Sequence, residues 1–133
     1  MSIVLDTNVI VAALIQKGIV RELILDHPGA FSTPEACIDE VWENREAWNR
    51  RQVAEAIVRE ALAFLSEDFI TVVPRSVYRE KEAEAAALIR DPDDVPVVAL
   101  ALSVDNEGIW TFNTRDFVTP QCSPGAGSWA RLR

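Results

Sequence analysis

Cysteine and histidine are scarce in this sequence. The 133 residues include two cysteines, Cys37 and Cys122, and one histidine, His27. The cysteines are far apart and lack CxxC spacing, and a thiolate metal site needs more ligands than these two. A histidine-based metal site or a Ser-His-Asp relay would depend on His27 alone, whose neighbours "LDHPG" are typical of a helix end. The sequence therefore argues against these two kinds of site.

Long hydrophobic runs and an excess of positive charge are also missing. No apolar run approaches the roughly 20 residues of a membrane span. The first residues, "MSIVLDTNVI", lack the basic segment of a signal peptide. We therefore expect a cytoplasmic protein that does not contact a membrane. The 13 Lys and Arg against 21 Asp and Glu give a net charge of −8, unlike many nucleic-acid binders, whose affinity depends on phosphate contacts.

The hydrophobic content, 49% of the chain, is sufficient for one folded domain over residues 1–133. Short apolar stretches alternate with segments of helical periodicity, and this alternation predicts an α/β fold. We expect a three-layer α/β/α sandwich with a central, mostly parallel sheet. The predicted strands are 2–5, a brief one at 31, 68–74 and 108–112; the predicted helices are 9–15, 19–25, 32–47, 53–65, 77–89 and 95–103, and 119–133 is a turn-rich tail.

Two local patterns predict details of these helices. Ser32 and Glu35 have the spacing of a capping box at the start of the helix 32–47. In the next helix, Ile57 and Phe64 recur at helical spacing, which predicts that both face the core.

Two aspartates follow predicted strands, and ligands of parallel α/β sheets bind beyond the carboxyl ends of the strands. Asp6 comes directly after residues 2–5, and Asp116 follows "GIWTF" by a few positions. Each has an ordinary structural alternative. Asp6 is also suited to cap the helix that follows it, and Asp116 also suits a polar turn closed by Asn113.

Glu40 is the acid of its helix that the helical wheel turns inward. At 100° per residue, it falls on the margin of the apolar face that holds Cys37 and Val41, whereas Asp39 points to water. An inward carboxylate is costly unless it is paired or bound to metal. The alternative to a site is a salt bridge to Arg45 or another basic residue.

Three aspartates crowd the start of the apolar helix 95–103. Asp91, Asp93 and Asp94 stand in "DPDD", and crowded carboxylates repel one another unless a cation relieves them. Asp93 is the expected helix cap, and Asp94 is best placed to point across the strand ends. The alternative is a set of caps in a solvated turn.

Carboxylates that converge without Cys or His select hard cations, Mg²⁺ or Mn²⁺. Such ions bind phosphates and activate water. The acidic positions therefore predict metal-dependent hydrolysis of a phosphodiester bond.

Four stretches in this order resemble the motifs of the PIN-domain nucleases, the family that includes the VapC toxins of prokaryotic toxin–antitoxin pairs. They are "VLDTNVIVAAL", "TPEACIDEV", "DVPVVALALS" and "WTFNTRDF", and the resemblance covers about residues 2–118. The acids of the motifs fall on Asp6, Glu40, Asp94 and Asp116, with Thr7, Asn8, Thr111 and Asn113 as polar companions and Asp91 or Asp93 as further ligands.

The resemblance implies a ribonuclease that uses Mg²⁺ or Mn²⁺, often as a homodimer and with an antitoxin as partner. The four acids would be metal ligands, and a water on the metal would attack the phosphorus. Candidates for RNA contact, each otherwise a solvated surface charge, are Lys17, Arg45, Arg50, Arg51 and Arg115.

Three alternatives compete with this interpretation. A haloacid-dehalogenase-type phosphatase needs an aspartate where Asn8 stands, and a lysine near "DPDD". A phosphate-receiving signalling domain needs a second acid beside Asp6. A non-catalytic protein whose acidic groove holds a basic peptide fits the same residues, but predicts no turnover.

Overall fold

A five-stranded sheet forms the centre of the protein. The computed structural model describes residues 2–112 and 128–130. The strand order is β3-β2-β1-β4-β5, in which β1 to β4 are parallel and β5 is antiparallel to β4. The elements are β1 Ile3–Leu5, α1 Thr7–Ile15, α2 Ile19–Asp26, β2 Phe31–Pro34, α3 Glu35–Glu43, α4 Arg45–Asn49, α5 Glu55–Asp68, β3 Ile70–Val73, α6 Arg75–Tyr78, the 3-10 turn η1 Arg79–Lys81, α7 Glu82–Leu88, the 3-10 turn η2 Pro92–Asp94, α8 Val95–Ser103, β4 Ile109–Thr111 and β5 Ser128–Ala130.

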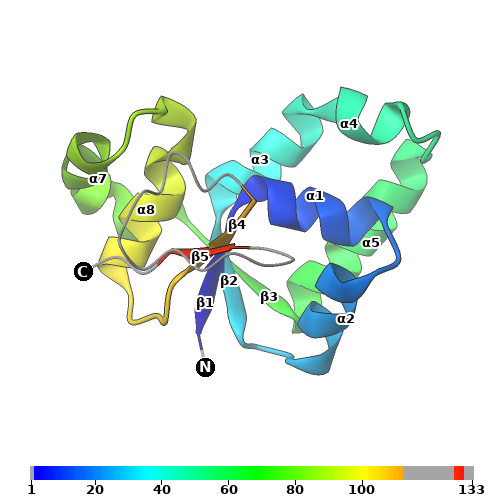
Figure 1. Ribbon diagram of the computed structural model, residues 1–133, viewed down its shortest axis with the longest axis horizontal. Helices are drawn as coiled ribbons and strands as arrows, with labels where there is room; N and C mark the ends of the chain where they lie inside the picture. Colours follow the sequence, from blue (N-terminus) through cyan, green and yellow to red (C-terminus); the bar gives the residue numbers. More distant parts are fainter. Residues whose placement is uncertain (1, 113–127, 131–133) are drawn as a thin grey trace.

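Helices cover both faces of the sheet. Figure 1 shows α7 and α8 on one side of the strands and α1, α2 and α5 on the other. In the middle of the sheet, Val4 of β1 is in register with Ser32 of β2 and with Ile109 of β4. The predicted α/β/α arrangement with a mostly parallel sheet is therefore confirmed.

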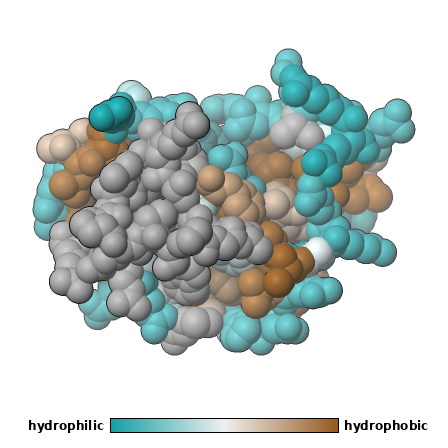
Figure 2. All heavy atoms as spheres, viewed as in Figure 1, coloured by the Kyte–Doolittle hydropathy of each residue, from teal (hydrophilic) through white to brown (hydrophobic). Residues whose placement is uncertain are grey.

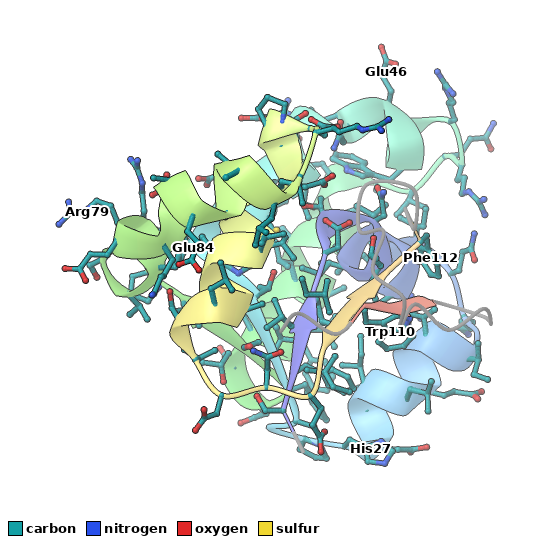
Figure 3. All side chains as sticks on the ribbon, turned by 60° about the vertical axis from the view of Figure 1, so that its left-hand side comes forward. His27, Glu46, Arg79, Glu84, Trp110 and Phe112 are labelled. Atoms are coloured by element: carbon teal, nitrogen blue, oxygen red, sulfur yellow. The ribbon has the colours of Figure 1, made fainter. Side chains whose placement is uncertain are left out.

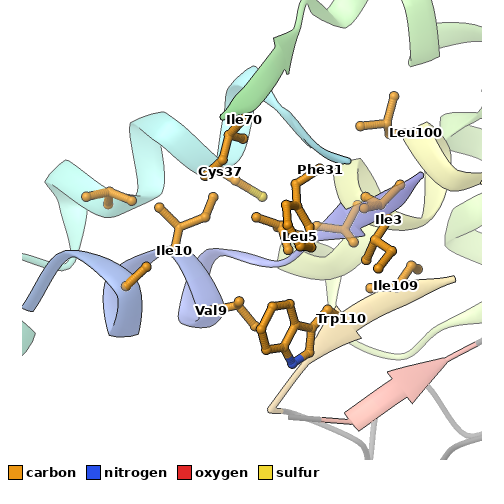
Figure 4. Close-up of a cluster of buried hydrophobic side chains, with 14 of the residues drawn as sticks. Ile3, Leu5, Val9, Ile10, Phe31, Cys37, Ile70, Leu100, Ile109 and Trp110 are labelled. Carbon is orange, nitrogen blue, oxygen red and sulfur yellow. The ribbon is translucent and has the colours of Figure 1, made fainter. Parts of the chain in front are cut away.

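The core fills the space between β1 and its helices. Val4 and Leu5 are fully buried, as expected for the central strand of a sheet covered on both faces. Figure 4 shows part of this core, where side chains of β1 and β2 meet those of α1 and α3. Helix α8 is apolar on nearly every side, and its residues 97–100 have no exposed surface, which agrees with its predicted central position.

None of the helices in the described part of the chain combines the length and the apolar composition that a membrane crossing requires.

Helix α5 buries a different face from the one predicted. Val58, Leu62 and Leu65 face the core, whereas Ile57 and Phe64 are 58% and 52% exposed. The helix carries two apolar stripes. They lie about 100° apart, because each buried residue is next in sequence to an exposed apolar residue and one position turns the helix by about 100°. Periodicity alone does not tell which stripe meets the sheet.

The predicted capping box at Ser32 is wrong. Ser32 lies within β2, and α3 begins only at Glu35, after Pro34. The carboxylate of Glu35 instead accepts the backbone N–H of Arg75 at 2.8 Å. The predicted helix 32–47 is also interrupted at Asn44, which separates α3 from α4.

Candidate active site

Asp6 stands at the carboxyl end of β1, where it is fixed from two sides. Its Oδ1 accepts the backbone N–H of Thr7 at 2.8 Å, so Asp6 is indeed the N-cap of α1. Its Oδ2 accepts the hydroxyl of Thr111, on β4, at 2.7 Å. With 5% of its surface exposed, Asp6 is a buried carboxylate whose orientation is set by both neighbouring elements.

Glu40, on α3, is joined to this group through Thr7. The buried hydroxyl of Thr7 donates a hydrogen bond to Oε2 of Glu40. Glu40 is partly buried and Asp39 is exposed, so the inward orientation predicted by the helical wheel is confirmed. Within the described part of the chain, Arg45 lies 3.9 Å from Glu55 and does not form the alternative salt bridge with Glu40.

The environment of Glu40 is unfavourable to its negative charge. Burial raises the pKa of Glu40, the hydrogen bond from Thr7 opposes this shift, and the charges of Asp6, Asp93 and Glu43 raise the pKa further. The negative charges of Asp6, Asp93 and Glu43 therefore all act on Glu40 at this edge of the sheet. A divalent cation would relieve such repulsion.

The "DPDD" segment forms the turn η2 and leads into α8. The side chain of Asp91 accepts the backbone N–H of Asp93 at 3.0 Å. Asp91 therefore caps η2, which Pro92 starts as a separate 3-10 turn. The prediction that Asp93 caps the apolar helix is wrong, because Asp93 lies within this turn and the N-cap position of α8 is Asp94. Asp94, at the start of α8, is 6% exposed, and Asp93 is exposed.

Comparison with known families agrees with this arrangement. The sequence model of the PIN domain matches residues 4–122. The chain belongs to the PIN domain family. The match includes the positions of Asp6, Glu40 and Asp94, and it extends beyond Asp116. Comparison with the curated proteins finds no significant match. PIN domains are generally nucleases, so the family supports a nucleic acid as the molecule on which this domain acts.

Two residues inside the stretch "TPEACIDEV" support the site, although neither of them was predicted to have a role in it. The buried hydroxyl of Thr33 donates to the carbonyl oxygen of Leu5 at 3.0 Å, and so ties β2 to the last residue of β1. Cys37, on α3, is buried, and burial raises the pKa of its thiol to about 12. Hydrogen bonds with Thr7 and Thr33 lower this pKa, and the charge of Asp6 raises it. The thiol therefore stays protonated at neutral pH, and Cys37 packs beneath the acids as a neutral side chain.

Some of the remaining residues predicted for the site or for RNA contact lie in the described part of the chain, and others lie outside it. Asn8 is exposed on the first turn of α1. Among the candidates for RNA contact, Arg50 pairs with Glu46 at 3.5 Å, and Lys17 is exposed between α1 and α2. His27 is an exposed cap at the end of α2, and Figure 3 shows it at the other end of the sheet from Phe112. The predicted site residues Asn113, Arg115 and Asp116 lie outside the described residues.

Within residues 2–112 and 128–130, no three acidic, histidine or cysteine side chains are close enough together to hold a metal ion. Two carboxylates joined by Thr7, together with Asp94 at the start of α8, supply oxygen donors only. Oxygen donors of this kind suit Mg²⁺ or Mn²⁺ better than softer cations.

Proposed function

We propose that this PIN domain, spanning residues 1–133, is an endoribonuclease that hydrolyses RNA phosphodiester bonds and depends on Mg²⁺ or Mn²⁺. The observation that carries the proposal is the link through Thr7, which holds the carboxylates of Asp6 and Glu40 together at the carboxyl edge of a parallel sheet. Ligands of such sheets bind beyond this edge.

Four acids would hold the metal: Asp6, Glu40, Asp94 and Asp116. The donor set supports a hard cation, since every member offers carboxylate oxygens. The raised pKa of Glu40 supports it further, because burial and the nearby charges of Asp6 and Asp93 disfavour its ionised form unless positive charge arrives. When bound, the cation supplies an activated water and neutralises charge on the phosphate.

The side chains around the acids have positioning roles in this proposal. Thr111 and the backbone of Thr7 each donate to one oxygen of Asp6, so the orientation of this carboxylate is set by donors on two elements. The Thr7 hydroxyl fixes Glu40 in the same way. Because these donors sit on β4 and α1, the carboxylates are aimed by rigid elements instead of loops.

The biological setting proposed for the nuclease follows the family resemblance. We place it in the cytoplasm as a homodimer and as the toxin of a toxin–antitoxin pair, with the antitoxin as its protein partner. The proposed phosphate contacts are Lys17, Arg45, Arg50, Arg51 and Arg115. Arg45 and Arg50 also lie 3.9 Å from Glu55 and 3.5 Å from Glu46.

The proposal is tested by incubating RNA with the purified protein in Mn²⁺ and in EDTA. We expect cleavage only in Mn²⁺, and a large loss of cleavage in Asp6→Asn. Asp26→Asn is the matched control, because Asp26 is an exposed aspartate at the end of α2. Circular dichroism verifies that both variants fold. If the wild-type protein leaves RNA intact but binds a basic peptide without metal, the non-catalytic alternative replaces the proposal.

A further inference from the structure

Strand β3 lies at one edge of the sheet. Among the described residues, β2 pairs with one side of β3 and no strand pairs with the other. A strand with one neighbour directs about half of its backbone N–H and C=O groups away from that neighbour. In the described part of the chain, the backbone of Ile70–Val73 forms no hydrogen bond outside the sheet. The sequence of β3, "ITVV", also lacks the charges and prolines that commonly block the edge strands of natural sheets.

A groove opens onto the start of this strand. Its volume is about 420 Å³, and it is lined by residues 66–72 and Gly29; we call it the β3 groove. Residues 66–68 are the end of α5, and residues 70–72 belong to β3. Thr71 is exposed, whereas Ile70 is buried. A chain that enters the β3 groove therefore meets the open edge of the strand.

The β3 groove is separate from the candidate active site. Ile70, the first residue of β3, is in register with Phe31 of β2, and Phe31 is in register with Ile3, the first residue of β1. The groove thus lies toward the amino ends of the parallel strands. Asp6 follows the carboxyl end of β1, at the opposite side of the sheet.

An aromatic pair adjoins the β3 groove. The ring of Phe69 lines the groove, and its centroid lies 5.1 Å from that of Phe64, on α5. Phe64 is 52% exposed, although it is a large apolar side chain. The pair therefore offers an apolar contact to a side chain of any segment that lies along β3.

The charge of the β3 groove selects among possible occupants. Glu67 and Asp68 line it, and both are exposed. Within residues 2–112 and 128–130, neither acid belongs to an ion pair. Carboxylates repel phosphates and attract basic side chains, and the net charge of −8 acts in the same direction. The groove therefore favours a basic protein segment over a nucleic acid.

A second copy of this chain suits the β3 groove less well. It would bring its own net charge of −8, and β3 itself has no basic residue. Arg75, just beyond β3, is already paired with Glu82 at 2.7 Å. The charges of the groove therefore indicate a different, basic partner.

Hydrophobic side chains are also exposed over α1 and α2, as Figure 2 shows. The groove between these helices is lined by apolar and uncharged polar residues of the described part of the chain. Its lining therefore does not select a partner by charge, whereas that of the β3 groove does.

We propose that the β3 groove docks an extended, basic segment of another protein, which adds a strand to the sheet beside β3. Basic side chains of this segment pair with Glu67 and Asp68, and an apolar side chain packs on Phe64 and Phe69. In strand addition, main-chain hydrogen bonds give affinity and side-chain contacts give specificity. Because β3 has only four residues, the charged and apolar contacts supply part of the affinity as well.

The test uses a short, labelled peptide of alternating lysine and valine, whose affinity is measured by fluorescence anisotropy at physiological salt, where distant charges are screened. Glu67→Gln combined with Asp68→Asn removes the acids of the groove. Asp105→Asn combined with Glu107→Gln is the control, because it removes the same charge from two exposed acids between α8 and β4. Thr71→Lys places a cation on the edge of β3. Circular dichroism verifies that all variants fold.

We expect the wild type to bind the peptide, and the variant without Glu67 and Asp68 to bind it roughly 2- to 30-fold more weakly. The control should bind as the wild type does, and Thr71→Lys should abolish binding. A peptide methylated at alternate backbone nitrogens should bind more weakly, because it has lost main-chain donors. Bound peptide should also slow amide hydrogen exchange in Ile70–Val73 and leave exchange in β4 unchanged.

The opposite results overturn the proposal. Equal losses in the two double variants would show that net charge alone attracts the peptide. A wild-type protein that does not bind the peptide, or that binds it without slower exchange in β3, excludes strand addition. A wild-type dimer that Thr71→Lys converts to a monomer, measured by sedimentation, assigns the strand edge to a second copy. None of these measurements uses RNA, so the proposed nuclease function is tested independently.

Discussion

The hydroxyl of Thr111 lies 2.7 Å from Oδ2 of Asp6 and donates a hydrogen bond to it across 105 positions of sequence. The bond exists because β4 is the parallel neighbour of β1 in the sheet. Both partners are buried, so the carboxylate at the end of one strand is held by the last residue of the next.

Thr111→Val should therefore destabilise the protein by about 1–3 kcal/mol, because it leaves a buried carboxylate oxygen without this donor while the side-chain shape is kept. Thr111→Ser retains the hydroxyl and should cost less. Urea unfolding followed by fluorescence measures both changes. A Val variant that unfolds at the same urea concentration as the wild type would show that the bond contributes nothing to stability.

The two apolar stripes of α5 allow a matched test of the fold. Leu65 is 4% exposed and Ile57 is 58% exposed, and the two side chains are isomers. Leu65→Ala should lower the free energy of unfolding by about 2–5 kcal/mol, whereas Ile57→Ala should change it by about 0.5 kcal/mol or less. Thermal or urea unfolding of both variants decides this. A larger loss in Ile57→Ala than in Leu65→Ala would mean that the helix buries its other stripe.

Local sequence patterns correctly predicted the elements whose pattern allows a single interpretation. Helix α8 has the predicted bounds, 95–103, because it is apolar on nearly every side and begins at an acidic turn. Glu40 was placed correctly, because Cys37 and Val41 define one clear apolar face of α3. Asp6 was also placed correctly, because it directly follows a predicted strand of a parallel sheet.

The missed features depend on partners distant in sequence or on a choice between equal local options. The antiparallel pairing of β5 with β4 has no local signal, since it joins residues 128–130 to 109–111. Thr33 was missed because its importance comes from the register that sets β2 beside β1. Asp93 was wrongly predicted as the cap of α8 because a separate 3-10 turn, Pro92–Asp94, precedes the helix and has its own cap in Asp91.

The pH dependence of stability follows from Glu40. Its pKa is raised in the folded protein, mainly by burial, so the folded state binds a proton there more tightly than the unfolded chain does. The stability contributed by Glu40 is then fully present below its ordinary pKa of 4.5 and is lost as the pH rises through the raised folded value. Glu40→Gln does not ionise, so it should not suffer this loss.

In EDTA, Glu40→Gln should therefore melt at a higher temperature than the wild type at neutral pH, and the difference should shrink as the pH falls toward 4.5. Differential scanning calorimetry across this pH range measures it. Asp39→Asn, an exposed neighbour, is the control and should shift the melting temperature little. A wild-type protein that is more stable than Glu40→Gln at neutral pH without metal would contradict the prediction.

The thiol of Cys37 gives an independent probe of the packing beneath the acids. In a Cys122→Ser background, Cys37 is the remaining cysteine. Burial and a pKa of about 12 should make it unreactive toward a thiol reagent in the native protein, because the thiolate is the reactive form. It should react at once in denaturant. Rapid, stoichiometric labelling of the native protein would show that the space beneath the acids is open.

The central claim is that the carboxylate of Glu40, joined to Asp6 through Thr7, takes part in metal-dependent cleavage of RNA. The most direct measurement is the initial rate of RNA cleavage against Mn²⁺ concentration for the wild type, Glu40→Gln and Asp39→Asn, with folding verified by circular dichroism. We predict that Glu40→Gln loses activity by orders of magnitude and needs more Mn²⁺, while Asp39→Asn, one position away and exposed, cleaves as the wild type does. Equal rates and superimposable metal curves for Glu40→Gln and the wild type would contradict the account.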